Sequence, residues 1–175
     1  ADEAGGREAL SRSAEFALAL TLPSTVALIV IPGPLIAVLF GRGAFETADI
    51  AATALAVAIY GAGLPAFVLQ KIAQPVFFAR ENTTDPFRYA LWGMGINVVA
   101  AVGLTPVLGF ASAALATTLA AWANLFLLWR GARRYGPSAR PDARMIHRAP
   151  RILAASLVMG VAAWGLEALL APALA

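Results

Sequence analysis

The chain has 175 residues, of which 60% are hydrophobic and only 13% are charged, and its mean hydropathy is +0.75. A soluble globular domain is about 45 to 50% apolar and about 25% charged, so this chain has too little polar surface to be one. The same hydrophobicity excludes a disordered chain, and the lack of cysteine excludes a disulfide scaffold and thiolate metal sites. The composition therefore predicts an integral membrane protein.

Long uncharged runs indicate where the chain crosses the membrane, because about 20 apolar residues in a helix span a hydrocarbon core about 30 Å thick. These runs are too long and too irregular for the alternating strands of a membrane barrel, so the expected fold class is all-α. Pro106 and Gly109 divide the longest run into a helical hairpin. About five transmembrane helices are expected, at 16–40, 50–79, 87–105, 110–129 and 152–175.

The basic residues are distributed unevenly between the two sides of these helices. If the N-terminal segment 1–15 is cytoplasmic, all but two of the 13 Lys and Arg residues lie on the cytoplasmic side, most of them in a basic loop at 130–151. The exceptions are Arg42, in an outside loop, and Lys71, within a helix. The positive-inside rule therefore predicts a cytoplasmic N-terminus and an outside C-terminus.

The basic loop also bears on the partners of the protein. A pI near 10.0 would suggest nucleic acid for a soluble chain, but arginines next to two membrane helices are expected to contact anionic lipid headgroups. We therefore expect membrane lipids as partners and no nucleic acid, with a specific anionic ligand as the alternative. His147 has no ligand residue near it in the sequence, so metal binding there is not expected.

The first 15 residues are polar and partly acidic and lack an early apolar core, so they do not resemble a secretory signal peptide. The sequence has no initiating Met, and the number of expected spans is odd. We expect an excerpt from a longer transporter, with a processed product as the alternative.

Two stripes of small residues indicate where helices pack closely, because small side chains let neighbouring backbones approach. Each stripe repeats every four residues. The first is Ala54, Ala58, Ala62 and Ala66, and the second is Ser112, Ala116, Ala120 and Asn124. Both are expected to lie at interfaces of a helix bundle.

Polar residues at membrane depth are the best functional candidates, since burying them is costly. Asn97 and Thr117 lie at equal distances from the middle of the expected hairpin turn, so they should meet at one depth. A direct hydrogen bond is one interpretation, and a site for a monovalent cation such as Na+, completed by acidic groups elsewhere, is the other. Lys71 either extends its amine to the cytoplasmic interface or lines an anion cavity for the substrate.

No residue pattern indicates chemistry on a covalent bond. The sequence contains no paired carboxylates, no nucleophile next to a base and no cluster of metal ligands in a recognisable spacing. We therefore expect a protein that is not an enzyme and that needs no cofactor, apart from the cation considered above.

Several short segments together resemble the bacterial lipid II flippases, the MurJ or MviN family. The motif positions include Arg42, Gly43, Phe45, Pro65 and Pro86. The segments that carry the resemblance are 39–45 (Leu-Phe-Gly-Arg-Gly-Ala-Phe), 60–67 (Tyr-Gly-Ala-Gly-Leu-Pro-Ala-Phe), 75–81 (Pro-Val-Phe-Phe-Ala-Arg-Glu), 96–99 (Ile-Asn-Val-Val) and 115–124 (Leu-Ala-Thr-Thr-Leu-Ala-Ala-Trp-Ala-Asn). Their order and spacing match the family, and they cover nearly the whole chain.

This resemblance implies a fourteen-helix transporter of the multidrug/oligosaccharidyl-lipid/polysaccharide exporter superfamily, in which the chain supplies helices nine to thirteen. Such flippases move lipid II, the undecaprenyl-pyrophosphate-linked peptidoglycan precursor, across the bacterial cytoplasmic membrane by alternating access. They bind its headgroup in a cationic cavity and its lipid tail in a groove. The helix at 152–175 would form part of that groove.

The chain departs from the family pattern in three respects. The loop before Pro86 reads Asn-Thr-Thr-Asp instead of the usual Asp-Thr-basic-Thr, and Ala101 stands where some members have a second polar residue one turn after Asn97. The arginines essential in the family belong to helices before this segment. Two alternatives follow, namely a flippase for another polyprenyl-linked saccharide or drug exporter of the same superfamily, and a non-transporting membrane scaffold.

Overall fold

The computed structural model describes residues 3–42, 46–136, 139 and 141–174, which are helical over most of their length and contain no strand. The helices are α1 (Glu3–Val30), α2 (Pro32–Phe40), α3 (Thr47–Phe78), α4 (Thr84–Leu108), α5 (Ala111–Ala132), the short 3-10 helix η1 (Arg133–Tyr135) and α6 (Ala143–Leu174). Five of them, α1, α3, α4, α5 and α6, are long and apolar enough to cross a membrane. The predicted all-α membrane fold is confirmed.

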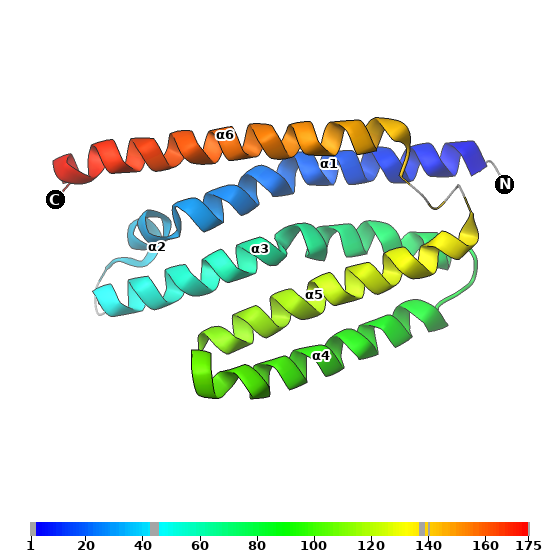
Figure 1. Ribbon diagram of the computed structural model, residues 1–175, viewed down its shortest axis with the longest axis horizontal. Coiled ribbons are helices and arrows are strands. Elements are labelled where there is room, and N and C mark those ends of the chain that lie inside the picture. The colour runs from blue at the N-terminus through cyan, green and yellow to red at the C-terminus, as the bar shows by residue number, and fades with distance from the viewer. Residues whose placement is uncertain (1–2, 43–45, 137–138, 140, 175) are drawn as a thin grey trace.

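The five long helices lie side by side in the order α6, α1, α3, α5, α4, as Figure 1 shows. Each helix packs chiefly on its neighbours in this row, and the short α2 packs on α3. Helices α4 and α5 form the expected hairpin, which turns at Gly109 with a positive φ of 54° that suits glycine. The row departs from chain order in two respects, since α5 separates α3 from α4 and α6 returns to pack beside α1.

Most of the arginines lie at the same end of the helices, measured along the helix axes, and we call this end of the bundle the basic end. It is formed by the start of α1, the connection between α3 and α4, and the connection between α5 and α6 (Figure 1). Arg42, after α2, lies at the opposite end. Because successive long helices run in opposite directions, the basic residues that the sequence predicts on the cytoplasmic side lie at the same end of the bundle.

The first expected span, 16–40, is divided into two helices. The break falls at Ile31, whose φ of −124° and ψ of 44° lie outside the helical region. A residue that precedes proline is disfavoured in the helical region, and Pro32 also lacks the N–H that would continue the helix. Residues 3–15, which we expected as a separate segment, form the first turns of α1 instead, because Glu, Arg, Ala and Leu are good helix formers.

The basic loop is also shorter than expected. Instead of spanning 130–151, the connection between α5 and α6 begins with η1 and ends before Ala143. Arg130 lies in α5, and Arg144, Arg148 and Arg151 lie in α6. Asp142 fixes the start of α6, since its Oδ1 accepts a hydrogen bond from the backbone N–H of Met145 at 2.7 Å. Helix α6 therefore begins directly after the capping residue Asp142, several residues before its apolar run begins at Ile152.

Close packing follows the predicted stripes of small residues. Ala66 on α3 and Ala116 on α5 are completely buried, which confirms that both stripes lie at interfaces. Helices α1 and α6 also approach closely at one point. A Cβ atom added to Gly160 of α6 would overlap Cγ1 of Val26 on α1, so a larger residue fits at this crossing only if Val26 shifts.

Candidate functional site

The polar residues of the hairpin contact each other as expected. Asn97 on α4 donates a hydrogen bond from Nδ2 to Oγ1 of Thr117 on α5 at 3.1 Å, and both side chains are half-buried. The Thr117 hydroxyl in turn donates to the carbonyl oxygen of Ala113 at 2.8 Å. The predicted direct hydrogen bond is therefore present.

The same geometry bears on the predicted cation site. The Thr117 oxygen accepts a hydrogen bond from Asn97, whereas Oδ1 of Asn97 makes no hydrogen bond to a described residue. Ala101, one turn after Asn97, has no oxygen in its side chain. Oxygen ligands suit a hard cation, so these two side chains fit part of a coordination shell that groups outside this chain would have to complete.

A second polar pair, which the sequence analysis did not identify, joins α3 to α5. Gln70 donates from Nε2 to the carbonyl oxygen of Ala121 at 2.7 Å, and its Oε1 accepts a hydrogen bond from Nδ2 of Asn124 at 2.9 Å. Oδ1 of Asn124 is buried and has no hydrogen-bond partner. Both residues are polar within uncharged runs, which is the sequence signal for them, and Asn124 is also the last member of the second stripe of small residues.

Two further side chains of α5 donate to backbone carbonyls of α3. The hydroxyl of Thr118 reaches the oxygen of Ile59 at 2.9 Å, and Nε1 of Trp122 reaches the oxygen of Ala62 at 3.0 Å. Together with the Gln70 pair, these contacts connect residues 59–70 of α3 to residues 118–124 of α5. In an apolar environment such hydrogen bonds fix the register of two helices.

Lys71 is exposed on α3 and makes no hydrogen bond or ion pair with any described residue. It lies seven residues before the last residue of its helix, Phe78, or about 10 Å along the axis at 1.5 Å per residue. The amine can extend over much of that distance toward the basic end. Both interpretations of Lys71 stay predictions.

The family motif positions are spread over the structure. Arg42 is exposed beyond α2, whereas Pro65 is buried in α3 and Pro86 is buried in the first turn of α4. Gly43 and Phe45 lie outside the described residues. The structure does not bring the described motif positions together into one site.

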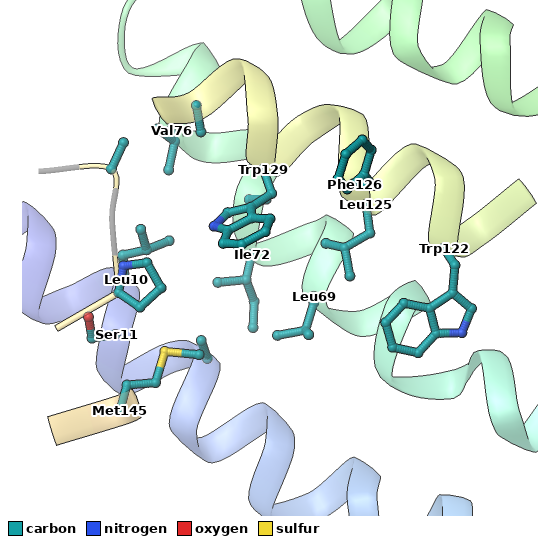
Figure 2. A pocket seen from close by; sticks show the side chains of 15 residues that line it. Leu10, Ser11, Leu69, Ile72, Val76, Trp122, Leu125, Phe126, Trp129 and Met145 are labelled. Atoms are coloured by element: carbon teal, nitrogen blue, oxygen red, sulfur yellow. The ribbon is translucent and has the colours of Figure 1, made fainter. Parts of the chain in front are cut away.

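An apolar cavity of about 390 Å³ lies near the basic end, between α1, α3, α5 and the start of α6 (Figure 2). Ile72 of α3 and Trp129 of α5 form part of its wall, and Met145 of α6 approaches from the other side. The one hydroxyl in the lining, that of Ser11, accepts a hydrogen bond from the backbone N–H of Asp142 at 3.0 Å. The cavity therefore suits a hydrocarbon chain better than a polar ligand.

A polar cluster at the basic end connects the start of α4 and the turn before it to η1. Oδ2 of Asp85 accepts hydrogen bonds from Arg134 and from Asn82, both at 2.5 Å, and Arg134 also donates to the hydroxyl of Tyr89 at 3.1 Å. Asn82 donates as well to the hydroxyl of Tyr135 at 2.7 Å. The residue pattern around Pro86 that departs from the family thus has a structural role in this chain.

Comparison with known proteins identifies the family. The family described as lipid II flippase MurJ matches residues 1–175. The probable lipid II flippase MurJ of Rhizobium meliloti (strain 1021) is 40% identical over 157 residues, which is 87% of this chain and 28% of that protein. The corresponding protein of Rhizobium tropici is 40% identical over 150 residues, again 28% of its length. The chain thus spans little more than a quarter of these relatives.

The fold agrees with that of a solved flippase. A lipid II flippase MurJ in an inward closed conformation superposes with a TM-score of 0.83, at 23% identity, over 95% of this chain and 34% of the solved one. At 23% identity this structural similarity establishes only that the folds agree. Membership of the family is established by the family match over residues 1–175. This chain, a row of five apolar helices with a basic end, belongs to the MurJ family of lipid II flippases.

Proposed function

We propose that this chain is the C-terminal portion of a lipid II flippase, which moves the undecaprenyl-pyrophosphate-linked peptidoglycan precursor across the cytoplasmic membrane by alternating access. The observation that supports this best is the family match over residues 1–175. The chain would supply helices nine to thirteen of the complete transporter. In this role it binds and moves a lipid without changing its covalent bonds, so it is not an enzyme.

The chain would contribute chiefly to the apolar part of the transport path. The apolar cavity beside Trp129 and Met145 fits a hydrocarbon chain, and α6 presents large exposed side chains such as Val161 and Leu169, which are 70% and 77% exposed. We assign α6 to the groove for the lipid tail on this basis. Lys71 is the candidate in this chain for contact with the anionic headgroup, and its exposure is compatible with that role.

We propose further that the basic end faces the cytoplasm, because the positive-inside rule relates arginine-rich ends to that side. Residues 1–175 contain no cysteine, so a direct test introduces single cysteines into this segment of the full-length protein after any cysteines elsewhere have been replaced. Thr84→Cys would place a thiol at the basic end, and Phe110→Cys would place one at the opposite end. In intact cells a membrane-impermeant maleimide should label the second variant and not the first, and the reverse result would overturn the orientation.

Complementation tests the transport function. The full-length gene should restore growth of bacteria depleted of their own lipid II flippase. In a chimera, the part of the Rhizobium meliloti flippase that aligns with this chain would be replaced by residues 1–175, and it should also restore growth. A chimera that reaches the membrane at normal levels but gives no growth would contradict the proposal, and would favour a flippase for another polyprenyl-linked saccharide or a scaffold.

We keep the cation site at Asn97 and Thr117 as a separate proposal. It is supported by the unpartnered Oδ1 of Asn97 beside the Thr117 hydroxyl. If Na+ binds there in the full-length protein, NaCl should raise the melting temperature above the value in choline chloride, and Asn97→Ala should abolish the difference. If the difference persists in Asn97→Ala, the pair serves only as a hydrogen bond.

A further inference from the structure

A charged hollow of about 440 Å³ lies between α1 and α6 near the basic end. It shares no residue with the apolar cavity described above. Four arginines and one carboxylate line it, which gives a formal net charge of +3. They are Arg12 and Glu15 from α1, and Arg144, Arg148 and Arg151 from α6. Glu8 forms an ion pair with Arg12 at 2.5 Å without lining the hollow, and counting it still leaves an excess of positive charge.

The hollow is charged toward one end and apolar toward the other. Helices α1 and α6 both start at the basic end and run in the same direction (Figure 1). Along each helix the charged lining residues come first, and Phe16 and Ala19 on α1 and Ile152 on α6 follow. Residues three or four apart share a helix face, so each helix presents a charged turn followed by an apolar one, and the excess of positive charge comes from α6. This arrangement matches an amphiphilic ligand with an anionic head.

One carboxylate orients two of the arginines. Glu15, whose side chain is 17% exposed, has Oε2 at 3.6 Å from Nε of Arg144, and its Oε1 accepts a hydrogen bond from Arg148. The two guanidinium groups stay about half exposed. Since each guanidinium carries five N–H donors, a single carboxylate leaves most of them available. Glu15 thereby holds two cationic groups in place for another anion.

The third arginine of α6 has no such partner. Arg151 is exposed and makes no hydrogen bond or ion pair with any described residue. It follows Arg148 by one turn, on the side of the hollow nearer the apolar wall. A ligand whose phosphate contacts Arg148 and Arg151 would therefore place its apolar portion beside Ile152.

We propose that this hollow binds a membrane phospholipid with an anionic headgroup. The phosphate would accept hydrogen bonds from Arg144, Arg148 and Arg151, since guanidinium groups bind phosphate in a bidentate manner. The acyl chain would lie along Phe16 and Ile152. The apolar wall favours a lipid over free phosphate. The hollow shares no residue with the apolar cavity and does not include Lys71, which we assign to the cargo, so lipid binding here can be measured without transport.

The test uses the delipidated full-length protein in detergent, with phosphatidylglycerol and phosphatidylcholine as probes. Native mass spectrometry counts the lipids retained, and thermal unfolding measures the stabilisation. We expect phosphatidylglycerol to be retained and to raise the melting temperature, and phosphatidylcholine to do neither. Arg151→Gln should weaken phosphatidylglycerol binding by about tenfold, the loss expected for a charged hydrogen bond. This variant removes no hydrogen bond or ion pair with a described residue, so it should fold normally.

Arg130→Gln is the matched control, because Arg130 is an exposed arginine at the same end, outside the hollow and without a partner among the described residues. It should bind phosphatidylglycerol as the unmodified protein does. Equal losses in Arg130→Gln and Arg151→Gln would overturn the proposal in favour of a diffuse basic surface. Equal retention of both lipids, or of neither, would also overturn it. If sodium phosphate alone raised the melting temperature as much as phosphatidylglycerol does, the ligand would be a free anion and the lipid proposal would be wrong.

Discussion

Asn97 of α4 and Thr117 of α5 are joined by a hydrogen bond of 3.1 Å between Nδ2 and Oγ1. The two residues lie on either side of the turn at Gly109, so the contact aligns the two helices of the hairpin in depth. A shift of either helix by one turn would separate the pair. Together with the hydrogen bond of 3.1 Å between the hydroxyls of Thr105 and Ser112, this contact fixes the register of the hairpin.

A double-mutant cycle measures the strength of this contact. We expect Asn97→Ala and Thr117→Val to show a coupling free energy of about 0.6 kcal/mol, the average for hydrogen bonds between membrane helices. The measurement is reversible unfolding of the full-length protein in detergent. Strictly additive effects of the two substitutions would mean that the side chains do not interact in the folded protein.

Gly160 tests how closely α6 and α1 approach. Gly160→Ala places a methyl group against Val26 and should lower the free energy of unfolding by about 1 to 3 kcal/mol, the usual cost of overpacking. Gly165→Ala is the control on the same helix, since nothing lies within 4 Å of a Cβ there, and it should be neutral or slightly stabilising. If both variants melt at the same temperature, the crossing is looser than described.

Gln70→Met tests the polar connection between α3 and α5. Methionine keeps the length of the side chain but removes both hydrogen bonds, and it leaves the amide of Asn124 without its acceptor. A buried polar group without a partner costs about 1 to 3 kcal/mol, so we expect a loss of stability in that range. Ser24→Ala, which removes only a bond within α1, should have little effect. Equal melting temperatures for the two variants would contradict this expectation.

Asp85→Asn tests the cluster at the basic end. The substitution removes the charge that Arg134 contacts, and we expect a loss of about 1 kcal/mol, because half of the Arg134 side chain is exposed to solvent. The loss should shrink at high salt, which screens the original ion pair. Glu8→Gln, which breaks a more exposed pair with Arg12, should change stability less. A loss for Asp85→Asn that is independent of salt would indicate that the neutral hydrogen bonds dominate.

The spans and the hairpin could be predicted because they depend on local properties of the sequence. The length of an uncharged run determines whether a helix crosses a membrane, and Pro106 and Gly109 indicate where the hairpin turns. The pairing of Asn97 with Thr117 follows from the turn alone. These contacts lie between neighbouring helices, so no knowledge of the wider arrangement was needed.

Contacts between distant helices could not be predicted in this way. Gln70 and Asn124 are 54 residues apart, and they meet only because α5 lies between α3 and α4 in the row. Glu15 and Arg148 are 133 residues apart and meet because α6 returns to pack on α1. Hydropathy carries no information about which helices are neighbours. It also does not indicate where a helix begins, since Asp142 caps α6 before the apolar run starts.

The position of α6 at the edge of the row has a mechanical consequence. Among the described residues, α1 is the only helix with which α6 makes extensive contact. A helix that is held by one neighbour moves with that neighbour, because packed interfaces shift as rigid bodies rather than deform continuously. Within the part of the chain that the structure describes, any tilt of α1 would therefore carry α6 and its exposed apolar side chains with it.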